Sequence, residues 1–309
     1  MQKVLISGIG GFSGRYFAAE LSDAGYEVIG TGLSPAIQDQ SFEYHQCDMC
    51  DLSQVISVVS AVSPNIALHL AGISFAAHDD VDEIYRSNII GARNLLKALS
   101  DLTVRPSAVL LASSANVYGN ANTEVLQEFH PLMPANDYAI SKLAMEHMAR
   151  LWQHLLPITI VRPFNYTGIG QSDHFLLPKI VGHFKRRAPS LELGNLNVVR
   201  DFSDVRFVAS CYRKILDAGN AGRRSGEAFN ICSERGYSLA EILAFMTQIS
   251  GYEMPITVNP AFVRTNEVIR LVGSRFKFDQ AFGKSFPPPI DVTLRWMYDH
   301  WADDPHRPG

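Results

Sequence analysis

Residues 3–14 read KVLISGIGGFSG, a short apolar run followed by closely spaced glycines. The run at 3–7 is too short for a helix and ends in glycine, which predicts a buried strand. Gly8, Gly11 and Gly14 then precede a stretch with helical spacing of apolar residues. A strand, a tight glycine turn and a helix start can together hold a dinucleotide pyrophosphate on backbone N–H groups. The alternative is an ordinary glycine-rich turn between a strand and a helix.

Strand-like and helix-like segments alternate over the first half of the chain. The sequence predicts strands at 3–7, 27–30, 43–45, 66–70, 109–112 and 158–161, and helices at 12–24, 52–62, 81–100 and 137–155. Such alternation is typical of βαβ crossovers in a parallel sheet, whose strands are apolar because both faces are covered. We therefore expect an α/β fold, with a Rossmann-type doubly wound parallel sheet over residues 1–165.

The pattern changes after residue 165, where glycine, proline and asparagine become more frequent. Further helices are predicted near 174–187, 205–217, 238–250 and 291–301. We expect a smaller C-terminal α/β substrate domain over 166–302, with some segments returning to the first domain. The polar tail at 303–309 contains two prolines and is expected to be disordered.

Composition narrows the classes of partner. The chain has 309 residues, 47% of them hydrophobic, which is enough to bury a large core. Its net charge of -4 does not suggest nucleic acid or a membrane as the main partner. We find neither a secretory signal nor an apolar stretch of the roughly 20 residues that span a bilayer, so a cytoplasmic protein is expected. The single Cys-x-x-Cys at Cys47 and Cys50 lacks a second pair, and no metal is expected.

The end of the second predicted strand bears on the choice of cofactor. An acid there binds the ribose 2′-hydroxyl of NAD, whereas an arginine nearby accommodates the 2′-phosphate of NADP. Residues 30–34 read GTGLS and contain neither, so nothing in them repels a phosphate. Arg15 is a possible partner for that phosphate. The sequence leans slightly to NADP (NADPH) and leaves NAD (NADH) open.

A second group of residues predicts the chemistry. Ser114 follows the fifth strand, and Tyr138 and Lys142 lie four positions apart, on one face of a predicted helix. A lysine charge about 4 Å away is worth about 4 kcal/mol at an effective dielectric near 20, enough to bring a tyrosine pKa from about 10 to near 7. Such a tyrosine can exchange a proton with a substrate oxygen held by a serine. The alternative is a half-buried surface pair.

These pieces together resemble the extended short-chain dehydrogenase/reductase family over nearly the whole chain. The matching stretches are SGIGGFSG at 7–14, HLAG at 69–72, ASSANVYG at 112–119, YAISK at 138–142 and RPFNYTG at 162–168. The resemblance implies that Ser114 is the catalytic serine and Tyr138 the proton donor and acceptor. Lys142 would bind the nicotinamide ribose and tune the tyrosine. Asn88 and Gly91 match a structural pair of the family.

The expected cofactor site spans the first four strands and the catalytic helix. Its residues are Gly8, Gly11, Phe12, Ser13, Gly14, Asp48, Met49, Leu70, Ala71, Gly72, Tyr138, Lys142 and Pro163. The small residues after the fourth strand would let the cofactor ribose approach. Asp48 could accept a hydrogen bond from the adenine amino group. Its alternative role is an N-cap for the helix that starts near Asp51.

The C-terminal half resembles the GDP-sugar branch of the family. The stretches are RPFNYTGIGQ at 162–171, LGNLNVVRDFSDV at 193–205 and NPAFVRTNEV at 259–268. The resemblance implies a nucleotide-sugar substrate, GDP-linked, bound by Ser114, Asn165, Lys179, Arg200, Arg264 and Glu267. Arginine suits a diphosphate because its planar fork bonds two oxygens at once. The alternatives are an ion pair of Arg200 with Asp201, and a surface pair of Arg264 with Glu267.

The residues after the catalytic serine bear on the reaction. Family dehydratases carry an acid there, and this chain has Ala115 and Asn116, which disfavours dehydration. The expected activity is reduction of the 4-keto group of GDP-4-keto-6-deoxy-mannose, giving GDP-rhamnose or its C4 epimer. A nucleotide-sugar 4-epimerase with tightly bound NAD would use the same catalytic residues and stays open. A non-catalytic dinucleotide-sensing protein is a third reading, disfavoured because such proteins commonly lack the tyrosine and lysine.

Oligomeric state is predicted from the same resemblance. Family members typically form dimers through two helices per subunit, which match the helices predicted at 81–100 and 137–155. The second of these has an apolar side broader than a single sheet-facing stripe. We therefore expect a homodimer.

Overall fold

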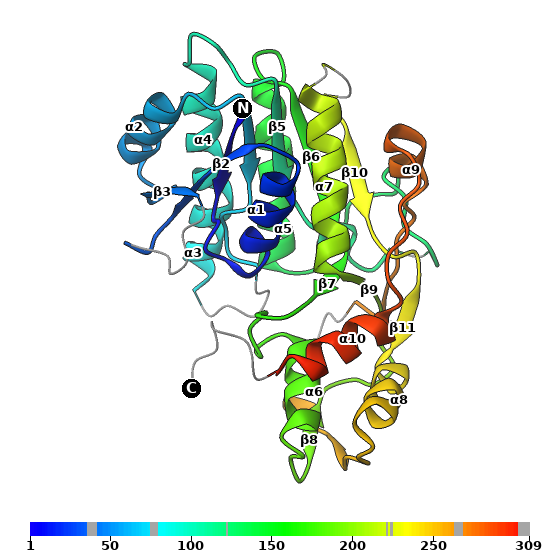
Figure 1. Ribbon diagram of the computed structural model, residues 1–309. Coiled ribbons are helices and arrows are strands. Elements are labelled where there is room, and N and C mark those ends of the chain that lie inside the picture. Colours follow the sequence, from blue (N-terminus) through cyan, green and yellow to red (C-terminus); the bar gives the residue numbers. More distant parts are fainter. Residues whose placement is uncertain are drawn as a thin grey trace.

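The computed structural model describes residues 1–35, 42–74, 80–121, 123–220, 222, 225–262 and 268–301. A seven-stranded sheet with helices on both faces forms one part of the molecule (Figure 1). Its strands, all parallel and ordered β10-β6-β5-β4-β1-β2-β3, are β1 (Lys3–Ser7), β2 (Glu27–Gly32), β3 (Glu43–Gln46), β4 (Ile66–His69), β5 (Ala108–Ala112), β6 (Ile158–Pro163) and β10 (Ala228–Ile231). The predicted Rossmann-type parallel sheet is confirmed.

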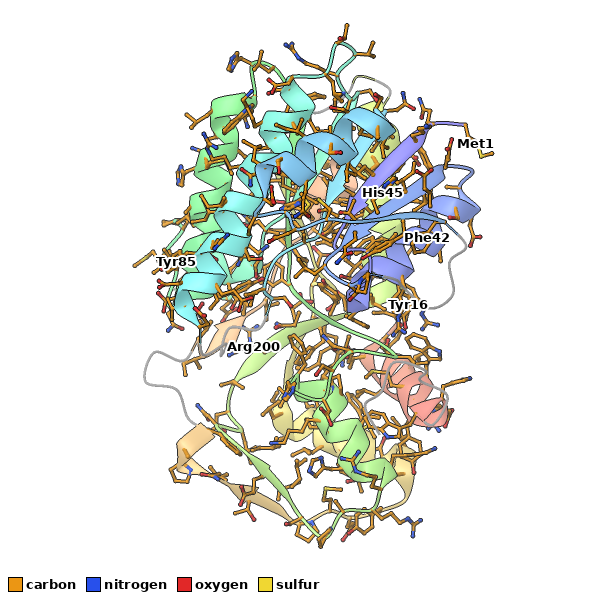
Figure 2. The ribbon with its side chains drawn as sticks, turned by 90° about the vertical axis from the view of Figure 1, so that its left-hand side faces the viewer. Met1, Tyr16, Phe42, His45, Tyr85 and Arg200 are labelled. Atoms are coloured by element: carbon orange, nitrogen blue, oxygen red, sulfur yellow. The ribbon has the colours of Figure 1, made fainter. Side chains whose placement is uncertain are left out.

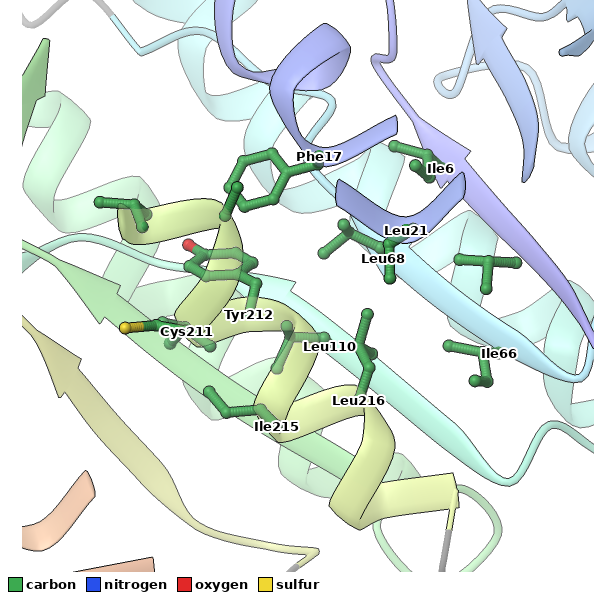
Figure 3. Packing of buried hydrophobic residues seen from close by; sticks show 14 of the residues in the cluster. Ile6, Phe17, Leu21, Ile66, Leu68, Leu110, Cys211, Tyr212, Ile215 and Leu216 are labelled. Carbon is green, nitrogen blue, oxygen red and sulfur yellow. The ribbon is translucent and has the colours of Figure 1, made fainter. Parts of the chain in front are cut away.

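Two layers of helices bury the faces of this sheet. Helices α1 (Phe12–Asp23) and α7 (Val205–Asn220) cover one face, and α2 (Leu52–Val62), α4 (Ala92–Ser100) and α5 (Asp137–Ala149) cover the other. In Figure 3, Phe17 of α1 and Tyr212 of α7 meet over the strands, with ring centroids 4.6 Å apart. The inner strands are mostly apolar because each contributes side chains to both layers, whereas the edge strand β3, with sequence EYHQ, is only half-buried.

The helix predicted at 81–100 is interrupted. Helix α3 (Val81–Tyr85) passes into a π-helical turn, η1 (Arg86–Gly91), and only then into α4. Asn88 is fully buried within this turn, and a Cβ at Gly91 would lie 3.2 Å from the Cβ of Met49. The extra residue of a π turn rotates the helix face locally, and such turns are frequent at functional sites.

The helix predicted at 137–155 also ends early, because the backbone after Ala149 changes to a 3₁₀ turn, η3 (Arg150–Trp152). Another 3₁₀ turn, η2 (Ala115–Tyr118), follows β5 directly. Both turns are short, as is usual for this tighter helix. The turn after β5 matters most for the site, because it immediately follows Ser114.

The second part of the molecule has small sheets wrapped by helices. One sheet contains β7 (Asn165–Thr167), β9 (Val199–Asp204), β11 (Gly236–Ser238) and β13 (Arg270–Leu271), and another pairs β8 (Leu191–Leu193) with β12 (Ile256–Val258). Three helices, α6 (Leu176–Lys185), α8 (Leu239–Ser250) and α10 (Ile290–Asp299), enclose its own core. The short elements η4 (Pro260–Phe262) and α9 (Phe276–Phe282) complete the described chain.

The chain crosses between the two parts more than once. After β9 it returns through α7 and β10, and β10 pairs with β6 at the edge of the large sheet. At a second crossing point, the Tyr16 hydroxyl and the Arg15 guanidinium both donate to the Ile169 carbonyl, at 2.7 Å for Tyr16. The division into residues 1–165 and 166–302 stays a prediction. Helix α7 and strand β10 are segments after residue 165 that pack on the large sheet. Among the described helices, none has both the length and the apolar character needed to cross a bilayer.

Candidate active site

A cleft of about 1410 Å³ runs from the glycine-rich loop, past the ends of β4, β5 and β6, to strand β9. Most of the residues expected at the cofactor and substrate sites line it. They are Gly8, Gly11, Phe12, Ser13, Asp48, Met49, Leu70, Ala71, Gly72, Ser114, Tyr138, Lys142, Pro163, Asn165, Lys179 and Arg200. Gly14, buried in the first turn of α1, is not among the lining residues, whereas Arg264 and Glu267 fall outside the described residues. The predicted residues therefore converge on one concave site from both parts of the molecule.

The glycine-rich loop has no room for side chains. Gly8 has a φ of +75°, and a Cβ there would lie 2.7 Å from the backbone nitrogen of Ala71. A Cβ on Gly14 would lie 2.1 Å from the Ile9 carbonyl oxygen. Helix α1 begins at this loop with Gly11 as its N-cap, and no side chain caps it. The loop thus offers backbone N–H groups to an anion, which is the geometry that a dinucleotide pyrophosphate requires.

An aromatic contact joins this loop to the segment after β6. The ring of Phe12 stacks on that of Tyr166 with centroids 6.1 Å apart and an interplanar angle of 17°. The Ser13 side chain hydrogen bonds to Tyr166, whose pKa is raised by burial and lowered by that bond, with burial dominant. Sequence reasoning did not single out Tyr166, although it lies within the RPFNYTG stretch.

The contacts of Asp48 and Arg15 correct two expectations. Asp48 accepts from the Cys50 backbone at 2.8 Å, and the N-cap of α2 is Asp51, which accepts from Ser53 and Gln54. The N-cap interpretation of Asp48 is therefore wrong, because the cap is Asp51, three residues later. The role of Asp48 toward adenine stays a prediction. Arg15 is directed to Ile169 and does not line the cleft, so its suggested role toward a 2′-phosphate is not supported.

The turn after β4 is fixed by Asn88. Its amide accepts from the Ile73 backbone at 3.0 Å and donates to the Ile73 carbonyl and to Ser141 Oγ, at 3.2 and 2.9 Å. Gly72 has a φ of +145°, and a Cβ there would lie 2.3 Å from Asn88 Oδ1. The π turn thus places a buried amide between the cofactor-facing turn and α5.

Helix α5 carries the tyrosine and the lysine to the cleft. Asn136 caps its start, with its side chain accepting from Ala139 at 2.9 Å. Tyr138 and Lys142 lie on its buried face, 7% and 6% exposed, and Ser114 faces them at 5% exposed. The lysine ammonium donates to the Ala112 carbonyl at 3.0 Å. The predicted trio is therefore assembled at the wall of the cleft, from β5 and α5.

The ionisation of this trio differs from the prediction. Burial raises the pKa of Tyr138 to about 12, although its hydrogen bond with Ser114 lowers it in part. Burial also lowers the pKa of Lys142 to about 8. The expected tyrosine pKa near 7 is therefore wrong for the protein alone, because the cost of burying a phenolate outweighs the help of its neighbours. Tyr138 is consequently protonated at neutral pH.

Asn116 is a site residue that the sequence reasoning considered only as the lack of an acid. It lines the cleft, in the turn η2, and its side-chain Nδ2 donates to Ser114 Oγ at 3.0 Å. Its backbone N–H also donates to Ser114 Oγ, at 3.2 Å. The signal in the sequence was its position two residues after the serine, where an N-cap side chain is expected to be contacted.

A buried ion pair supports the trio from behind. Arg162 of β6 binds Glu146 of α5 through two hydrogen bonds of 2.9 and 2.7 Å, and both side chains are at most 4% exposed. Ser113 Oγ donates to the same carboxylate at 2.6 Å. Arg162 also donates to the Tyr118 hydroxyl at 3.0 Å. One network therefore joins the residue before Ser114 to the helix of Tyr138.

Three predicted substrate residues lie at the other end of the cleft. Lys179 donates to the Glu192 carbonyl at 3.0 Å and lies 4.8 Å from the Phe262 ring centroid, while Asn165 donates to the Asp201 carbonyl at 3.3 Å. Arg200 lies where the two parts of the molecule meet (Figure 2). The carboxylate of Asp201 is wholly buried and accepts from Ser233, Glu234 and Gly273. The alternative interpretation, an ion pair of Asp201 with Arg200, did not predict these hydrogen bonds.

Over the described residues, no group of three or more histidine, cysteine, aspartate or glutamate side chains is placed to hold a metal ion. All four cysteines are free thiols. The groups that Ser114, Tyr138, Lys142 and Asn116 bring to the wall of the cleft are a hydroxyl, a phenol, an ammonium group and an amide.

Comparison with known proteins assigns the family. A model of the NAD dependent epimerase/dehydratase family matches residues 4–232. The chain belongs to this family. It is accordingly an NAD(P)-dependent oxidoreductase with the trio Ser114, Tyr138 and Lys142 in the cleft.

Two curated relatives cover nearly the whole chain. The GDP-6-deoxy-D-talose 4-dehydrogenase of Aggregatibacter actinomycetemcomitans is 32% identical over 96% of this chain and 97% of the relative. The GDP-6-deoxy-D-mannose reductase of Pseudomonas aeruginosa is 29% identical over 97% of each.

Two solved structures share the whole fold. A crystal structure of a candidate epimerase from Burkholderia cenocepacia J2315 is 48% identical, with a TM-score of 0.90, and the match covers 96% of this chain and 97% of the other. The structure of RMD from Pseudomonas aeruginosa complexed with NADPH is 28% identical, with a TM-score of 0.85 over 98% and 99% of the two chains.

Proposed function

We propose that the protein reduces the 4-keto group of GDP-4-keto-6-deoxy-mannose, giving GDP-rhamnose or its C4 epimer, GDP-6-deoxy-talose. The neutral residues Ala115 and Asn116 after Ser114 favour reduction over dehydration. Ser114, Tyr138 and Lys142 suffice for reduction, whereas a dehydratase needs further acid and base groups. Asn116 occupies the place of the dehydratase acid and is bound to Ser114 instead. The GDP-6-deoxyhexose relatives support both the nucleotide and the reacting carbon.

In this proposal a bound reduced nicotinamide supplies the hydride to C4 of the sugar. Tyr138, protonated because its pKa is about 12, gives its proton to the carbonyl oxygen as negative charge develops there. The Ser114 hydroxyl donates a hydrogen bond to the same oxygen. The ketone thus gains a hydride and a proton and becomes an alcohol. Arg200 and Lys179 would bind the diphosphate end at the far side of the cleft.

The glycine-rich loop fits the cofactor, and NADPH is the favoured form. Residues 30–34 place no carboxylate at the end of β2, so nothing in them repels a 2′-phosphate. The NADPH complex of the Pseudomonas aeruginosa protein supports the same choice. Because Arg15 is turned away, the preference for NADPH over NADH is expected to be modest.

The test is cofactor consumption with GDP-4-keto-6-deoxy-mannose, generated in place by a separate dehydratase. Stoichiometric oxidation of NADPH, with a GDP-6-deoxyhexose identified by NMR, is the expected result. The same assay with NADH gives the cofactor preference, and Tyr138→Phe is the matched control, expected to lose about 10²–10⁴-fold in kcat. Folded wild-type protein that consumes neither cofactor would reject the assignment.

A nucleotide-sugar 4-epimerase is the second candidate, supported by the 48% identical candidate epimerase. An epimerase oxidises and re-reduces the same carbon, so it uses the same trio and retains NAD. Denaturing the purified protein separates the two: release of about one NAD per chain favours the epimerase. A protein that carries no NAD and needs added NADPH favours the reductase.

We also propose that two copies associate through η1 and α5. Ile90 of η1, Ile140 of α5 and Leu151 of η3, the turn that follows α5, are 41%, 42% and 68% exposed. Tyr85 donates to Asp137 at 2.8 Å and holds the start of α5 against α3. A face with several exposed apolar side chains is typical of a subunit contact.

A further inference from the structure

The hydrogen bonds around the Ser114 hydroxyl occupy its acceptor sites and leave it free only to donate. A serine hydroxyl has one hydrogen and two acceptor lone pairs. The backbone and side-chain N–H groups of Asn116 both donate to Ser114 Oγ, at 3.2 and 3.0 Å. With both lone pairs engaged, the hydroxyl hydrogen must point elsewhere and donate.

The direction left open is toward the reacting centre. Ser114 hydrogen bonds with Tyr138, and the two side chains are 5% and 7% exposed, so bulk water is largely excluded from them. That hydrogen bond lowers the pKa of the phenol against the effect of burial, as donation to a developing phenolate would. A substrate oxygen placed between Ser114 and Tyr138 would meet two donors.

We propose that Asn116 is a positioning residue that fixes the Ser114 hydroxyl as a hydrogen-bond donor, to Tyr138 in the free protein and to the substrate oxygen when substrate is bound. The inference deepens the proposed function, on which its catalytic consequence rests. Asn116 itself needs no contact with the reacting atoms. It acts by occupying the two acceptor sites of the serine.

The type of residue at position 116 decides whether the Ser114 hydroxyl donates or accepts toward the site. An alanine would leave the backbone donor but free one lone pair, so the hydroxyl could rotate. An aspartate can only accept when ionised, so it would take the Ser114 hydrogen and reverse its direction. A serine turned in that way can no longer stabilise negative charge on the substrate oxygen. The amide is therefore the member of this set that holds the hydroxyl as a donor.

The turn η2 is what makes the arrangement possible. Ser114 is its N-cap, with extended φ and ψ of -158° and 147°, and accepts from the Asn116 backbone. The same turn brings the Asn116 side chain back over its own N-cap. Asn120, just beyond the turn, is exposed, does not line the cleft, and accepts from the Ile269 backbone at 3.1 Å. It provides a matched control for an added charge, since aspartate would keep that acceptor.

The experiment compares Asn116→Ala, Asn116→Asp and Asn120→Asp with wild type. In turnover with NADPH and GDP-4-keto-6-deoxy-mannose, we expect kcat to fall about tenfold in Asn116→Ala and about 100-fold in Asn116→Asp. Asn120→Asp should stay within about twofold of wild type. KM should change little, because the lost bond matters in the transition state.

A second measurement does not depend on the substrate. The Tyr138 ring is labelled with carbon-13 at Cζ, assigned by comparison with Tyr138→Phe, and titrated by NMR in the protein saturated with NADP⁺. We expect Tyr138 to ionise at higher pH in Asn116→Asp than in Asn120→Asp, because it has lost a donor. Identical titration of Tyr138 in these two folded variants would overturn the proposal, even if the substrate of the enzyme proved to be another sugar. Absence of turnover by wild type, with the titration shift present, would reject the proposed function alone.

Discussion

Tyr138 and Lys142 lie one turn apart, and burial favours the neutral form of each. The pKa of Tyr138 is raised to about 12 and that of Lys142 is lowered to about 8. At neutral pH the pair therefore holds a protonated phenol beside a protonated ammonium group, which is the state that can give a proton to a substrate. The hydrogen bond from Ser114 is the contact that partly offsets the burial of Tyr138.

Reduction should therefore be nearly independent of pH from 6 to about 8 and should fall at higher pH. Below pH 8 Lys142 is charged and Tyr138 is protonated; above it the lysine loses its proton first. The measurement is kcat/KM for NADPH oxidation across pH 6–10. Lys142→Arg, which keeps its charge, should be slower but should show no decline near pH 8. A rate that rises with pH through 7 in wild type would contradict this account.

Elements with a strong local signal were predictable, and those that depend on distant contacts were not. The short apolar strands and the glycine turn of the first sheet follow from runs and spacing in the sequence, and they lie within a few residues of their predicted positions. The π turn at 86–91 has no such signal, because it depends on the buried contacts of Asn88 and Gly91. Strands β7 to β13 are two to six residues long, and their pairing is set by neighbours far along the chain.

The site shows the same division. Most of its residues were predictable because they follow strand ends or share one face of a helix. The hydrogen bonds of Asn116, the stack of Tyr166 on Phe12 and the turning of Arg15 toward Ile169 were not. Each depends on a side-chain direction or on the second part of the molecule, neither of which spacing in the sequence specifies.

Substitutions of Gly11, the N-cap of α1, and of Gly14, in its first turn, should have different effects. A Cβ at Gly14 meets the Ile9 carbonyl oxygen at 2.1 Å, so Gly14→Ala should lower the free energy of unfolding by about 1–3 kcal/mol. A Cβ at Gly11 lies 3.3 Å from the nearest atom, the Gly8 carbonyl oxygen, so Gly11→Ala should fold. It should still weaken NADPH binding about tenfold or more, because the methyl group occupies the approach to the backbone.

Urea unfolding and a fluorescence titration of NADPH measure the two effects separately. Equal stability of Gly14→Ala and wild type would contradict the packing argument. Unchanged NADPH affinity in Gly11→Ala would contradict the assignment of the loop to the pyrophosphate.

The contact between β6 and α5 gives a further prediction. Arg162→Met would leave Glu146, 3% exposed, without its cation, and should lower the free energy of unfolding by about 3–5 kcal/mol. Adding Glu146→Leu should recover part of the loss, because no charge then remains buried. The comparison is made by urea unfolding of the two variants. A double variant no more stable than Arg162→Met would show that packing, and not the unpaired carboxylate, dominates.

At the scale of the whole molecule, the cleft is built from both parts. The large sheet supplies the glycine-rich loop and the trio, helix α6 supplies Lys179 and strand β9 supplies Arg200. The shared carbonyl of Ile169, bonded by Arg15 and Tyr16, holds the start of the cofactor-side helix to the second part. The two ends of the cleft are therefore tied to one another close to the site itself.

Introducing one charged side chain into the proposed interface tests the dimer. Leu151→Glu, on the exposed face that follows α5, should yield monomers, because it places a carboxylate in an apolar contact. Phe286→Glu, at an 84% exposed residue away from that face, should leave the mass unchanged. Light scattering coupled to size exclusion reports the mass. Monomeric wild type, or a dimeric Leu151→Glu protein, would remove the proposed interface.

Strand β10 has a consequence for how the protein is made. The large sheet is complete only when residues 228–231 reach β6, after the chain has already built β7, β8 and β9 elsewhere. A nascent chain that has emerged from the ribosome only to residue 165 therefore lacks both an edge strand and the helix α7 that covers one face. Such a chain leaves apolar strands uncovered during translation, when exposed sheet edges invite aggregation. Neither part should be recovered as a soluble fragment by cutting the gene at residue 165, and the enzyme should acquire protease resistance only once translation has passed β10.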